Sequence, residues 1–379
     1  MLEFLPELHN DWKTYLFFGF CGIAAFHLFF VLLSYARLAF HRSSKEVLAE
    51  KLPPVTIIIA ARNESQNLFN NIPFIMDQDY PEFEVIVVNH QSIDDSQYIL
   101  DAMAREYKNL RVIKVEKSKH LKYGKKLPLT IGIKGAKYEH LLFTDADCKP
   151  DSKTWIQSMA KRFNEKKQIV MGYGPYRKEK GFLNRFIRFD ATWIAVNYFS
   201  FAKMGAPYMA IGRNLAYTKT TFNNTNGFKS HYSLSSGDDD LFIQEAAKKK
   251  NYTINIDPDA FCYSDPVKSW SKLFRQKSRH YTTTEKYKVI KKWMLGIYPL
   301  TLLLLTSSFV ILIFDKNFLW LTLAIYLFVL TIKWIVLGRA FKKLEASKFI
   351  VWLPVWDLMY AIITPVLYYS IDKKDTKKW

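Results

Sequence analysis

Two carboxylates that could do chemistry stand one residue apart in the stretch FTDADC, at Asp145 and Asp147. An aspartate at the end of a strand can be ordinary turn chemistry, because its side chain bonds to nearby backbone amides. A carboxylate pair can also bind a divalent cation such as Mg²⁺ or Mn²⁺, which prefers hard oxygen ligands. The pair therefore raises the hypothesis of a metal site that carries a phosphate.

Further polar groups follow apolar runs elsewhere in the chain. Near-continuous apolar runs at residues 55–60, 84–89, 111–115 and 140–145 alternate with helix-like stretches such as SQNLFNNIPFIMDQ. This alternation predicts a parallel, doubly wound α/β sheet, in which ligands bind beyond the carboxyl ends of the strands. The residues expected to converge there are Arg62, Asn63, Glu64, His90, Asp94, Lys125, Asp145 and Asp147.

Each of these residues alone is ordinary loop composition, but four such loops at one edge favour a site for a metal-bound, phosphate-containing ligand. The sequence has no G-x-G-x-x-G stretch and no Walker loop, which argues against dinucleotide-binding and P-loop proteins. The net charge of +19 could indicate a nucleic-acid partner. The lysines gather beside apolar segments, however, which fits an anionic membrane surface and no nucleic acid. The three widely spaced cysteines fit a reduced cytoplasm.

Long apolar segments flank the polar middle of the 379-residue chain. We expect transmembrane helices at residues 14–37, 293–314 and 317–338, because about 20 apolar residues suffice to cross the hydrocarbon core. Acidic residues before the first segment, and no small-residue cleavage site after it, favour a retained anchor over a signal peptide. A fourth segment, 349–371, contains Asp357 and two prolines and is expected either to span the membrane or to re-enter it.

Positive charge beside these segments predicts their orientation. Lysine and arginine are scarce before the first segment, and frequent after it and before the second. This asymmetry predicts a cytoplasmic middle domain and an extracytoplasmic segment 1–13. The basic tail 372–379 stays in the cytoplasm if residues 349–371 are re-entrant or lie in the membrane interface, and it lies outside if they span the membrane; the sequence leaves these arrangements open.

Seven motifs in the middle of the chain share their order and spacing with a known family. The motifs are PPVTIIIAARNES, VVNHQSIDDS, GKKLPLTIGIKGA, TDADC, GRNLAY, SGDDDLF and RQKSRHY. Together they resemble the membrane-embedded family 2 glycosyltransferases, which include cellulose and hyaluronan synthases and ceramide glucosyltransferases. The resemblance covers roughly residues 52–282. It implies a cytoplasmic GT-A domain, Rossmann-like with a mostly parallel sheet, flanked by transmembrane helices.

The resemblance also implies roles for individual residues. Those implied to bind the nucleotide sugar are Ala61, Arg62, Glu64, His90, Asp94, Lys125 and Asp145. Asp147, with Asp145, is implied to hold Mg²⁺ or Mn²⁺ against the diphosphate. Those implied to be catalytic are Asp239, as general base, with Asp238, Gln276 and Arg279. Those implied to lie on the acceptor side are Gly212, Arg213, Asn214 and His280.

The chain departs from the family pattern at two positions. His90 stands where the nucleoside loop usually has an aspartate, which leaves the contact to uracil open. His280 replaces the tryptophan that ends the last motif, so the usual aromatic platform for the acceptor is altered. In addition, Asp238, Asp239 and Asp240 are consecutive, and a neighbour of Asp239 could be the base.

The expected reaction follows from general chemistry. A glycosyl diphosphate reacts once its leaving group is neutralised, which a divalent metal and an arginine can do. An acceptor hydroxyl attacks once a carboxylate takes its proton. With one base opposite the leaving group and no second nucleophile, the displacement inverts the anomeric centre.

Residues 181–205 combine apolar residues at helical spacing with cations, which is typical of an in-plane interface helix or of a core helix. The family's interface helix in this region favours the first interpretation. We expect transfer from a nucleotide sugar, with a UDP-sugar as the first candidate, to a membrane-associated lipid at the cytoplasmic face of a bacterial inner membrane. A processive polysaccharide synthase is the alternative, and a non-catalytic nucleotide receptor is a weaker one.

Overall fold

The computed structural model describes residues 10–42, 51–116 and 124–370. These residues form two units: a helical unit of residues 10–41 and 288–370, and an α/β unit made of the described residues between them. Most of the predicted segment 1–13, the whole of the tail 372–379 and residues 117–123 of the basic stretch lie outside the described residues.

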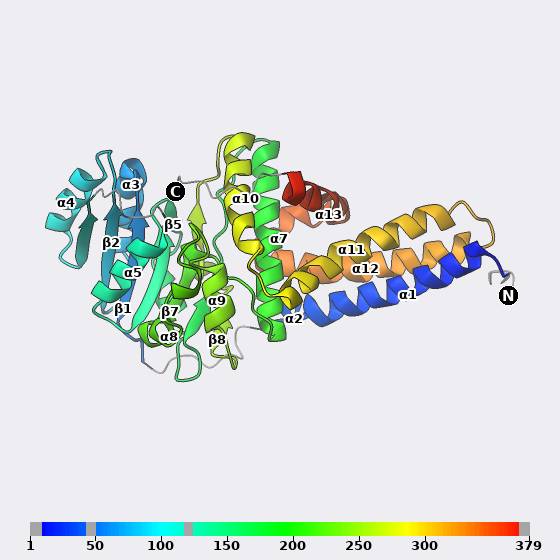
Figure 1. Ribbon diagram of the computed structural model, residues 1–379, viewed down its shortest axis with the longest axis horizontal. Coiled ribbons are helices and arrows are strands. Elements are labelled where there is room, and N and C mark those ends of the chain that lie inside the picture. The colour runs from blue at the N-terminus through cyan, green and yellow to red at the C-terminus, as the bar shows by residue number, and fades with distance from the viewer. Residues whose placement is uncertain (1–9, 43–50, 117–123, 371–379) are drawn as a thin grey trace. The chain divides into compact units, whose positions relative to one another are not determined.

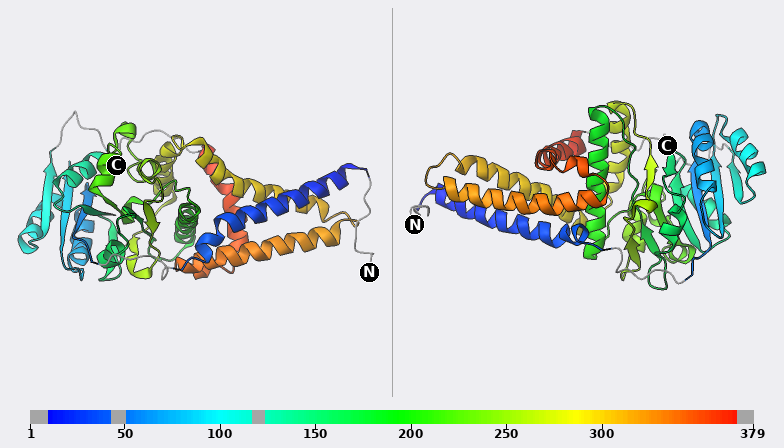
Figure 2. Two further views of the ribbon diagram at one scale, coloured as in Figure 1. Left: turned by 90° about the horizontal axis from the view of Figure 1, so that it is seen from below. Right: turned by 180° about the vertical axis from the view of Figure 1, so that it is seen from behind.

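The helical unit is built around three long helices that run side by side (Figures 1 and 2). Its helices are α1 (Trp12–Ser34), α2 (Ala36–Ala39), α11 (Val289–Leu312), α12 (Leu319–Lys343) and α13 (Leu353–Ser370), with a 3-10 turn at Ser347–Phe349. Helix α1 begins where the Asp11 carboxylate accepts a hydrogen bond from the Thr14 amide at 2.8 Å. The Phe17 and Phe318 rings stack at 4.8 Å where α1 meets the start of α12.

Three described helices are long and apolar enough to cross a membrane: α1, α11 and α12. Their bounds differ from the apolar segments read from the sequence mainly at α12, which continues past Gly338 through a polar turn to Lys343. Helix α13 has 18 residues and is not among these three candidate spans.

Charged and polar side chains meet inside the helical unit. Lys333 of α12 donates to Asp357 of α13 at 2.8 Å, and both residues are almost fully buried. The Tyr298 hydroxyl of α11 donates to the same carboxylate oxygen at 2.7 Å. A buried ion is costly unless it is paired and hydrogen-bonded, so these contacts tie α13 to α11 and α12.

The α/β unit is organised by a seven-stranded sheet with the strand order β3-β2-β1-β4-β7-β6-β8 (Figure 1). Strands β1 to β4 and the β6–β8 pair are parallel, and β7 runs antiparallel to both its neighbours. The expectation of a mostly parallel α/β sheet is therefore confirmed. The strands are β1 (Val55–Ala61), β2 (Phe83–His90), β3 (Leu110–Val115), β4 (His140–Asp145), β6 (Ile169–Met171), β7 (Leu215–Thr218) and β8 (Tyr252–Ile254), with a separate antiparallel pair β5 (Cys148–Pro150) and β9 (Cys262–Ser264).

Helices cover both faces of the parallel part of this sheet. Alternate residues of β1, such as Ile57 and Ile59, pack in one core with residues of α3, α4 and α6. On the other face α5 lies so close that a Cβ on Gly132 would be 2.6 Å from the Ile58 side chain. The helices are α3 (Ser65–Met76), α4 (Ser96–Glu106), α5 (Lys126–Gly135), α6 (Trp155–Ala160), α7 (Phe182–Met204), α8 (Lys219–Asn224), α9 (Asp240–Ala246) and α10 (Trp270–Thr284), with short 3-10 turns at Gly212–Asn214, Lys229–His231 and Pro258–Ala260.

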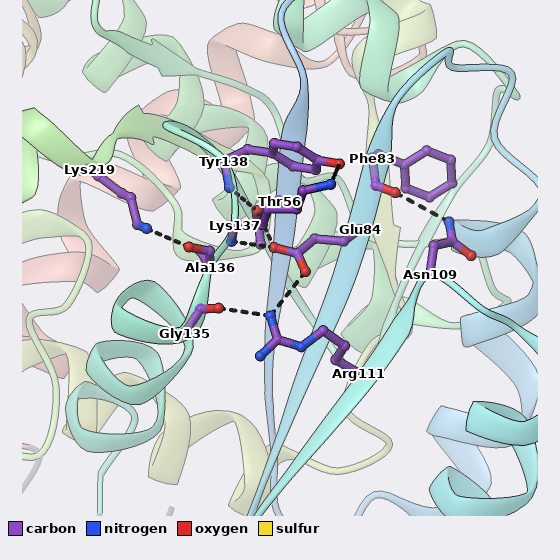
Figure 3. A network of polar contacts seen from close by, with 10 residues as sticks. All are labelled: Thr56, Phe83, Glu84, Asn109, Arg111, Gly135, Ala136, Lys137, Tyr138 and Lys219. Atoms are coloured by element: carbon purple, nitrogen blue, oxygen red, sulfur yellow. Dashed lines mark hydrogen bonds and ion pairs between the residues drawn. The ribbon is translucent and has the colours of Figure 1, made fainter.

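A polar network joins the first residues of the parallel strands (Figure 3). The buried Glu84 carboxylate of β2 accepts hydrogen bonds from the Thr56 hydroxyl of β1 at 2.8 Å and from Arg111 of β3 at 3.2 Å. It also accepts the Lys137 amide at 2.5 Å, which anchors the chain that leads into β4. Since these contacts lie at the amino ends of the strands, they stabilise the sheet at the edge opposite to the carboxyl ends.

Candidate active site

The carboxyl ends of β1, β2 and β4 bring the predicted donor-binding residues together. Ala61 is the last residue of β1, His90 of β2 and Asp145 of β4. The register pairs Ala61 with Asn89 and Ala60 with Asp145, so the three loops that follow emerge at one edge of the sheet. Lys125 joins them at the start of α5, where its ammonium lies 2.7 Å from Asp145.

The loops after β1 and β2 are fastened to each other. Asn63, in a left-handed conformation with φ 54°, accepts the Ile93 amide at 2.8 Å. The Asp94 carboxylate accepts the Ser65 amide at 3.0 Å and the Ser96 hydroxyl at 2.6 Å. One Asp94 oxygen thus joins the two loops and the other bonds within its own loop, and the donor-binding role that the resemblance implies for Asp94 stays a prediction.

Three further predicted residues lie at this edge of the sheet: Arg62 and Glu64 are half-buried and His90 is buried. Burial, together with the nearby Arg62 cation, lowers the pKa of His90 to about 4, so its ring is neutral at pH 7. Burial raises the pKa of Glu64, although a hydrogen bond from Asn67 at 2.5 Å counteracts this.

The carboxylate pair at the end of β4 has the geometry of a cation site. Ligand atoms of Asp145, Asp147 and Cys148 lie within 4.8 Å of one another. Burial alone would raise the pKa of Asp145, but the cations Lys125 and Arg213 lower it. The pKa of Asp147 is raised, first by burial and then by the negative charge of Asp145. Two carboxylates that repel each other in this way are suited to share a divalent cation.

The consecutive aspartates differ in their contacts. The Asp240 carboxylate accepts hydrogen bonds from the Tyr287 hydroxyl at 2.8 Å, the Thr283 hydroxyl at 2.5 Å and the Leu241 amide at 2.7 Å, and it is buried. This side chain therefore holds α9 against the end of α10.

Asp239 is half-buried and accepts only backbone amides among the described residues, from Gly212 at 2.9 Å and from Asp240 at 2.8 Å. Burial, together with the negative charges of Asp238 and Asp240, raises the pKa of Asp239 to about 8. A carboxylate with a pKa near the working pH is suited to exchange protons with a substrate.

Three further predicted residues, Arg213, Gln276 and Arg279, lie near the carboxylate pair. Arg279, on α10, interacts electrostatically with both Lys125 and Asp145, and its buried Nε has no hydrogen-bond partner among the described residues. Gln276 donates to the Tyr176 hydroxyl at 3.0 Å, and the Arg213 guanidinium lies 4.3 Å from the centre of the Tyr176 ring. These side chains face the site from α10 and from the 3-10 turn at Gly212–Asn214.

Two residues that the resemblance implies to lie on the acceptor side, Asn214 and His280, have different surroundings. The Asn214 amide donates to the carbonyl oxygens of Tyr173 and Ala260, both at 2.7 Å, and its oxygen accepts the Trp155 indole at 3.2 Å. Asn214 is fully buried, and these hydrogen bonds stabilise the packing of the protein core. His280, on α10, is exposed to solvent and interacts electrostatically with Arg279, Arg213 and Lys125, so its position agrees with the acceptor-side role that the resemblance implies, and that role stays a prediction.

Tyr176, which binds Gln276 and stacks on Arg213, carries no recognisable signal in the sequence. Lys126 is also absent from the sequence-based set, although it stands next to Lys125 in the GKK motif. Its ammonium is buried and donates to three backbone carbonyl oxygens in the loop before Asp238.

Two family descriptions match the chain over these elements. "Glycosyl transferase family 2" matches residues 56–227, which contain the strand-end loops and the carboxylate pair. "Glycosyl transferase family group 2" matches residues 155–369, which contain the consecutive aspartates, α10 and most of the helical unit, and this is more than half of the chain. The chain belongs to glycosyl transferase family group 2. It is a glycosyltransferase with apolar helices suited to a membrane.

Curated relatives of this glycosyltransferase match over shorter stretches. It is 26% identical over 98 residues to poly-beta-1,6-N-acetyl-D-glucosamine synthase of Staphylococcus epidermidis, covering 26% of this chain and 23% of the relative. It is 30% identical over 108 residues to glycosyltransferase AglE of Haloferax volcanii, covering 28% of this chain and 34% of the relative. The chain thus spans about a quarter to a third of the length of these relatives.

The glycosyltransferase also resembles a solved structure over nearly its whole length. Mannosyltransferase PcManGT of Pyrobaculum calidifontis, solved in complex with GDP-Man and Mn²⁺, matches with a TM-score of 0.55 and 16% identity. The match covers 90% of this chain and 97% of that chain. At this identity the likeness shows a common fold.

Proposed function

We propose that this glycosyltransferase transfers a sugar from a nucleotide sugar to a membrane-associated lipid, with inversion at the anomeric carbon. The observation that carries the proposal is the placement of Asp239. Its pKa is raised to about 8, and its neighbour Asp238 interacts with Lys125, which is paired with Asp145 of the carboxylate pair. The candidate base Asp239 and the candidate diphosphate site at Asp145 are therefore connected through the neighbouring charges of Asp238 and Lys125.

The residues at the end of β4 fit a divalent cation. Asp145 and Asp147 offer hard oxygen ligands. Burial and then the charge of Asp145 raise the pKa of Asp147, and a bound cation would offset both effects. The likeness to a structure that contains Mn²⁺ supports Mn²⁺ or Mg²⁺ as the ion. When bound, the ion neutralises charge on the diphosphate of the donor.

The chain's own residues account for the steps of the transfer. Asp239, when deprotonated, accepts the proton of the acceptor hydroxyl. The hydroxyl oxygen then forms the bond to the anomeric carbon, while the bond from that carbon to the diphosphate oxygen breaks. Arg279, whose Nε lies buried without a partner among the described residues, and Lys125 stabilise the charge that develops on the leaving diphosphate.

A surface of the α/β unit supports an acceptor held at a membrane. Phe182 of α7 lies 6.2 Å from Trp270 of α10, which lies 6.0 Å from Phe274 between ring centres, and these side chains are 56%, 40% and 38% exposed. Exposed cations, Arg185 and Arg275, stand on the same two helices. Aromatic rings beside cations suit the headgroup region of a bilayer. The rest of α7 is mostly buried, so only its first turns fit the expected interface helix.

The donor and the cellular location are proposed on indirect grounds. A UDP-sugar is the first donor to test, because the sequence resembles enzymes of that kind. A GDP-sugar is the next, because the similar mannosyltransferase structure holds GDP-Man. The cation asymmetry around the first apolar helix supports a catalytic domain in the cytoplasm, at a bacterial inner membrane.

A processive polysaccharide synthase is a second candidate, favoured by the partial match to poly-beta-1,6-N-acetyl-D-glucosamine synthase. One experiment separates the two functions. The purified full chain is placed in liposomes of a bacterial lipid extract and incubated with Mn²⁺ and a panel of radiolabelled nucleotide sugars, with Asp239→Asn as the inactive control.

We expect one donor to label material that is soluble in organic solvent. Label in a high-molecular-weight polymer indicates the polysaccharide synthase. No transfer from any donor refutes both functions.

A further inference from the structure

The loop that leads to the candidate base is held by a buried lysine. Lys126, only 3% exposed, donates from its ammonium to the carbonyl oxygens of His231 at 2.6 Å, Leu234 at 3.1 Å and Ser236 at 2.6 Å. An ammonium has three protons, and each of these contacts can use one of them. The contacts satisfy a charge that would be costly to bury without partners.

This loop has little regular structure of its own. It begins at the end of the 3-10 turn Lys229–His231 and reaches Asp238 through Gly237, whose φ of 102° favours glycine. The carbonyl oxygen of His231 also accepts the Leu234 amide at 3.2 Å, so the loop has one backbone bond of its own beside the three contacts of Lys126. The ammonium therefore fixes the path of the backbone immediately before Asp238 and Asp239.

The same turn of chain also contacts the donor side. Lys125, the preceding residue, pairs with Asp145 at 2.7 Å. Gly124, with φ 146°, packs so closely on the loop that an added Cβ would lie 3.0 Å from the carbonyl oxygen of Ser235. Two consecutive lysines thus link the carboxylate pair at the end of β4 to the loop before the candidate base.

We propose that Lys126 is a positioning residue for the transfer reaction, which holds Asp239 in register with the donor without touching the substrate. This inference rests on the proposed function, since it assigns a role relative to Asp239. A shift of a base by about 1 Å can lower a rate by about 10²-fold. Loss of Lys126 is therefore expected to lower kcat far more than donor binding.

The test replaces Lys126 by methionine, which keeps the length of the side chain and removes the charge and the donors. The matched control is Lys134→Met, on an exposed position of the same helix. Turnover is measured as nucleoside diphosphate released in the liposome assay at saturating donor. Binding of the corresponding nucleoside diphosphate with Mn²⁺ is measured by calorimetry.

We expect Lys126→Met to lower kcat by about 10²-fold and to change the Kd of the nucleoside diphosphate by less than about twofold. Lys134→Met should match the wild type in both. Lys126→Arg, which retains a cation and several donors, should recover at least tenfold of the lost kcat. A folded Lys126→Met variant with wild-type kcat, or one whose binding falls as much as its kcat, overturns the inference.

A second variant covers the case in which Lys126→Met does not fold. Gly124→Ala keeps the lysine but presses on Ser235 and strains a position with positive φ, so the same loop is displaced. The same separation of kcat from Kd is expected, and wild-type kcat in this variant overturns the inference. If the wild-type protein shows no turnover, the proposed function is refuted. If the wild-type protein turns over and Lys126→Met turns over equally fast, only the role of Lys126 is refuted.

Discussion

The protonation of Asp239 should govern the pH dependence of sugar transfer. Burial and the charges of Asp238 and Asp240 raise its pKa to about 8. Only the deprotonated carboxylate can accept the proton of the acceptor, so activity should rise with pH until the pKa is passed. With a pKa of about 8, about half of the molecules are active at pH 8 and about 1% at pH 6, so kcat/KM should fall about 50-fold between them.

Substitution of the neighbouring aspartate should move this transition in a known direction. Asp238→Asn removes one of the two like charges that raise the pKa of Asp239, so the rise in kcat/KM should occur at lower pH. Asp239→Asn removes the proton acceptor and should lower kcat by about 10²-fold to 10⁴-fold at high pH, where the wild-type carboxylate is deprotonated, and by less at low pH. Asp259→Asn, at an exposed position of the same unit, is the matched control and should leave the pH profile unchanged.

The assay measures initial rates at low donor concentration from pH 5.5 to pH 9.5, with Mn²⁺ held constant. Nucleoside diphosphate binding, measured across the same range, separates an effect on the base from an effect on the metal site. A rate that stays flat over this range, as expected for an aspartate with its ordinary pKa of about 4, would refute the reasoning. So would an Asp239→Asn variant that keeps the wild-type rate and transition.

Four further predictions concern the metal site, the stability of each of the two units and the orientation in the membrane. EDTA should abolish transfer, and Asp147→Ala should abolish Mn²⁺ binding in calorimetry while leaving thermal unfolding unchanged; full turnover in EDTA contradicts this. Lys333→Met alone should lower the free energy of unfolding in detergent by about 3 kcal/mol or more, because it leaves the Asp357 charge buried and unpaired. The double variant Lys333→Met with Asp357→Leu should recover most of this loss. Equal stability of the single and double variants would contradict this reasoning. Glu84→Ala should cost about 2 kcal/mol in the free energy of unfolding by leaving buried donors unsatisfied, with no change in Kd for the nucleoside diphosphate. An impermeant maleimide should label Ile93→Cys, a highly exposed position, in inside-out vesicles but not in intact cells, and the reverse pattern overturns the orientation.

The parts of the fold that the sequence predicts are those with continuous apolar runs. The predicted strand 55–60 is observed as β1 at Val55–Ala61, because every side chain in it is buried and most are β-branched. The strands β5, β6, β8 and β9 have three residues each, which is too short for any periodicity to appear. Helix α12 extends beyond the predicted segment because its last residues include the cations Arg339, Lys342 and Lys343, and the predicted segment is delimited by uncharged residues.

The candidate site also has parts that the sequence predicts and parts that it does not. Residue types at strand ends are enough to select Asp145 and Lys125, which the structure pairs. Asn214 has the chemistry of a ligand-binding residue, but its amide is fully used by the core, and only the three-dimensional packing reveals this. The sequence does not single out Lys126, because its partners are backbone carbonyl oxygens more than 100 residues away. Every residue has such a carbonyl group, so the sequence cannot indicate which of them a lysine contacts.

The Lys333–Asp357 pair also constrains the order in which the helical unit can be assembled. Lys333 emerges from the ribosome before Asp357, so α12 reaches the insertion machinery with an unneutralised cation. A lone lysine near the centre of a helix opposes insertion by about 2.5–3.5 kcal/mol. The apolar side chains of α12 outweigh this cost, so α12 can insert before α13 is made and then holds a cation without its partner. A chain that stops before α13 keeps this cation unpaired, so we expect its helical unit to be less stable than that of the full chain, and the pair makes that stability depend on completion of synthesis.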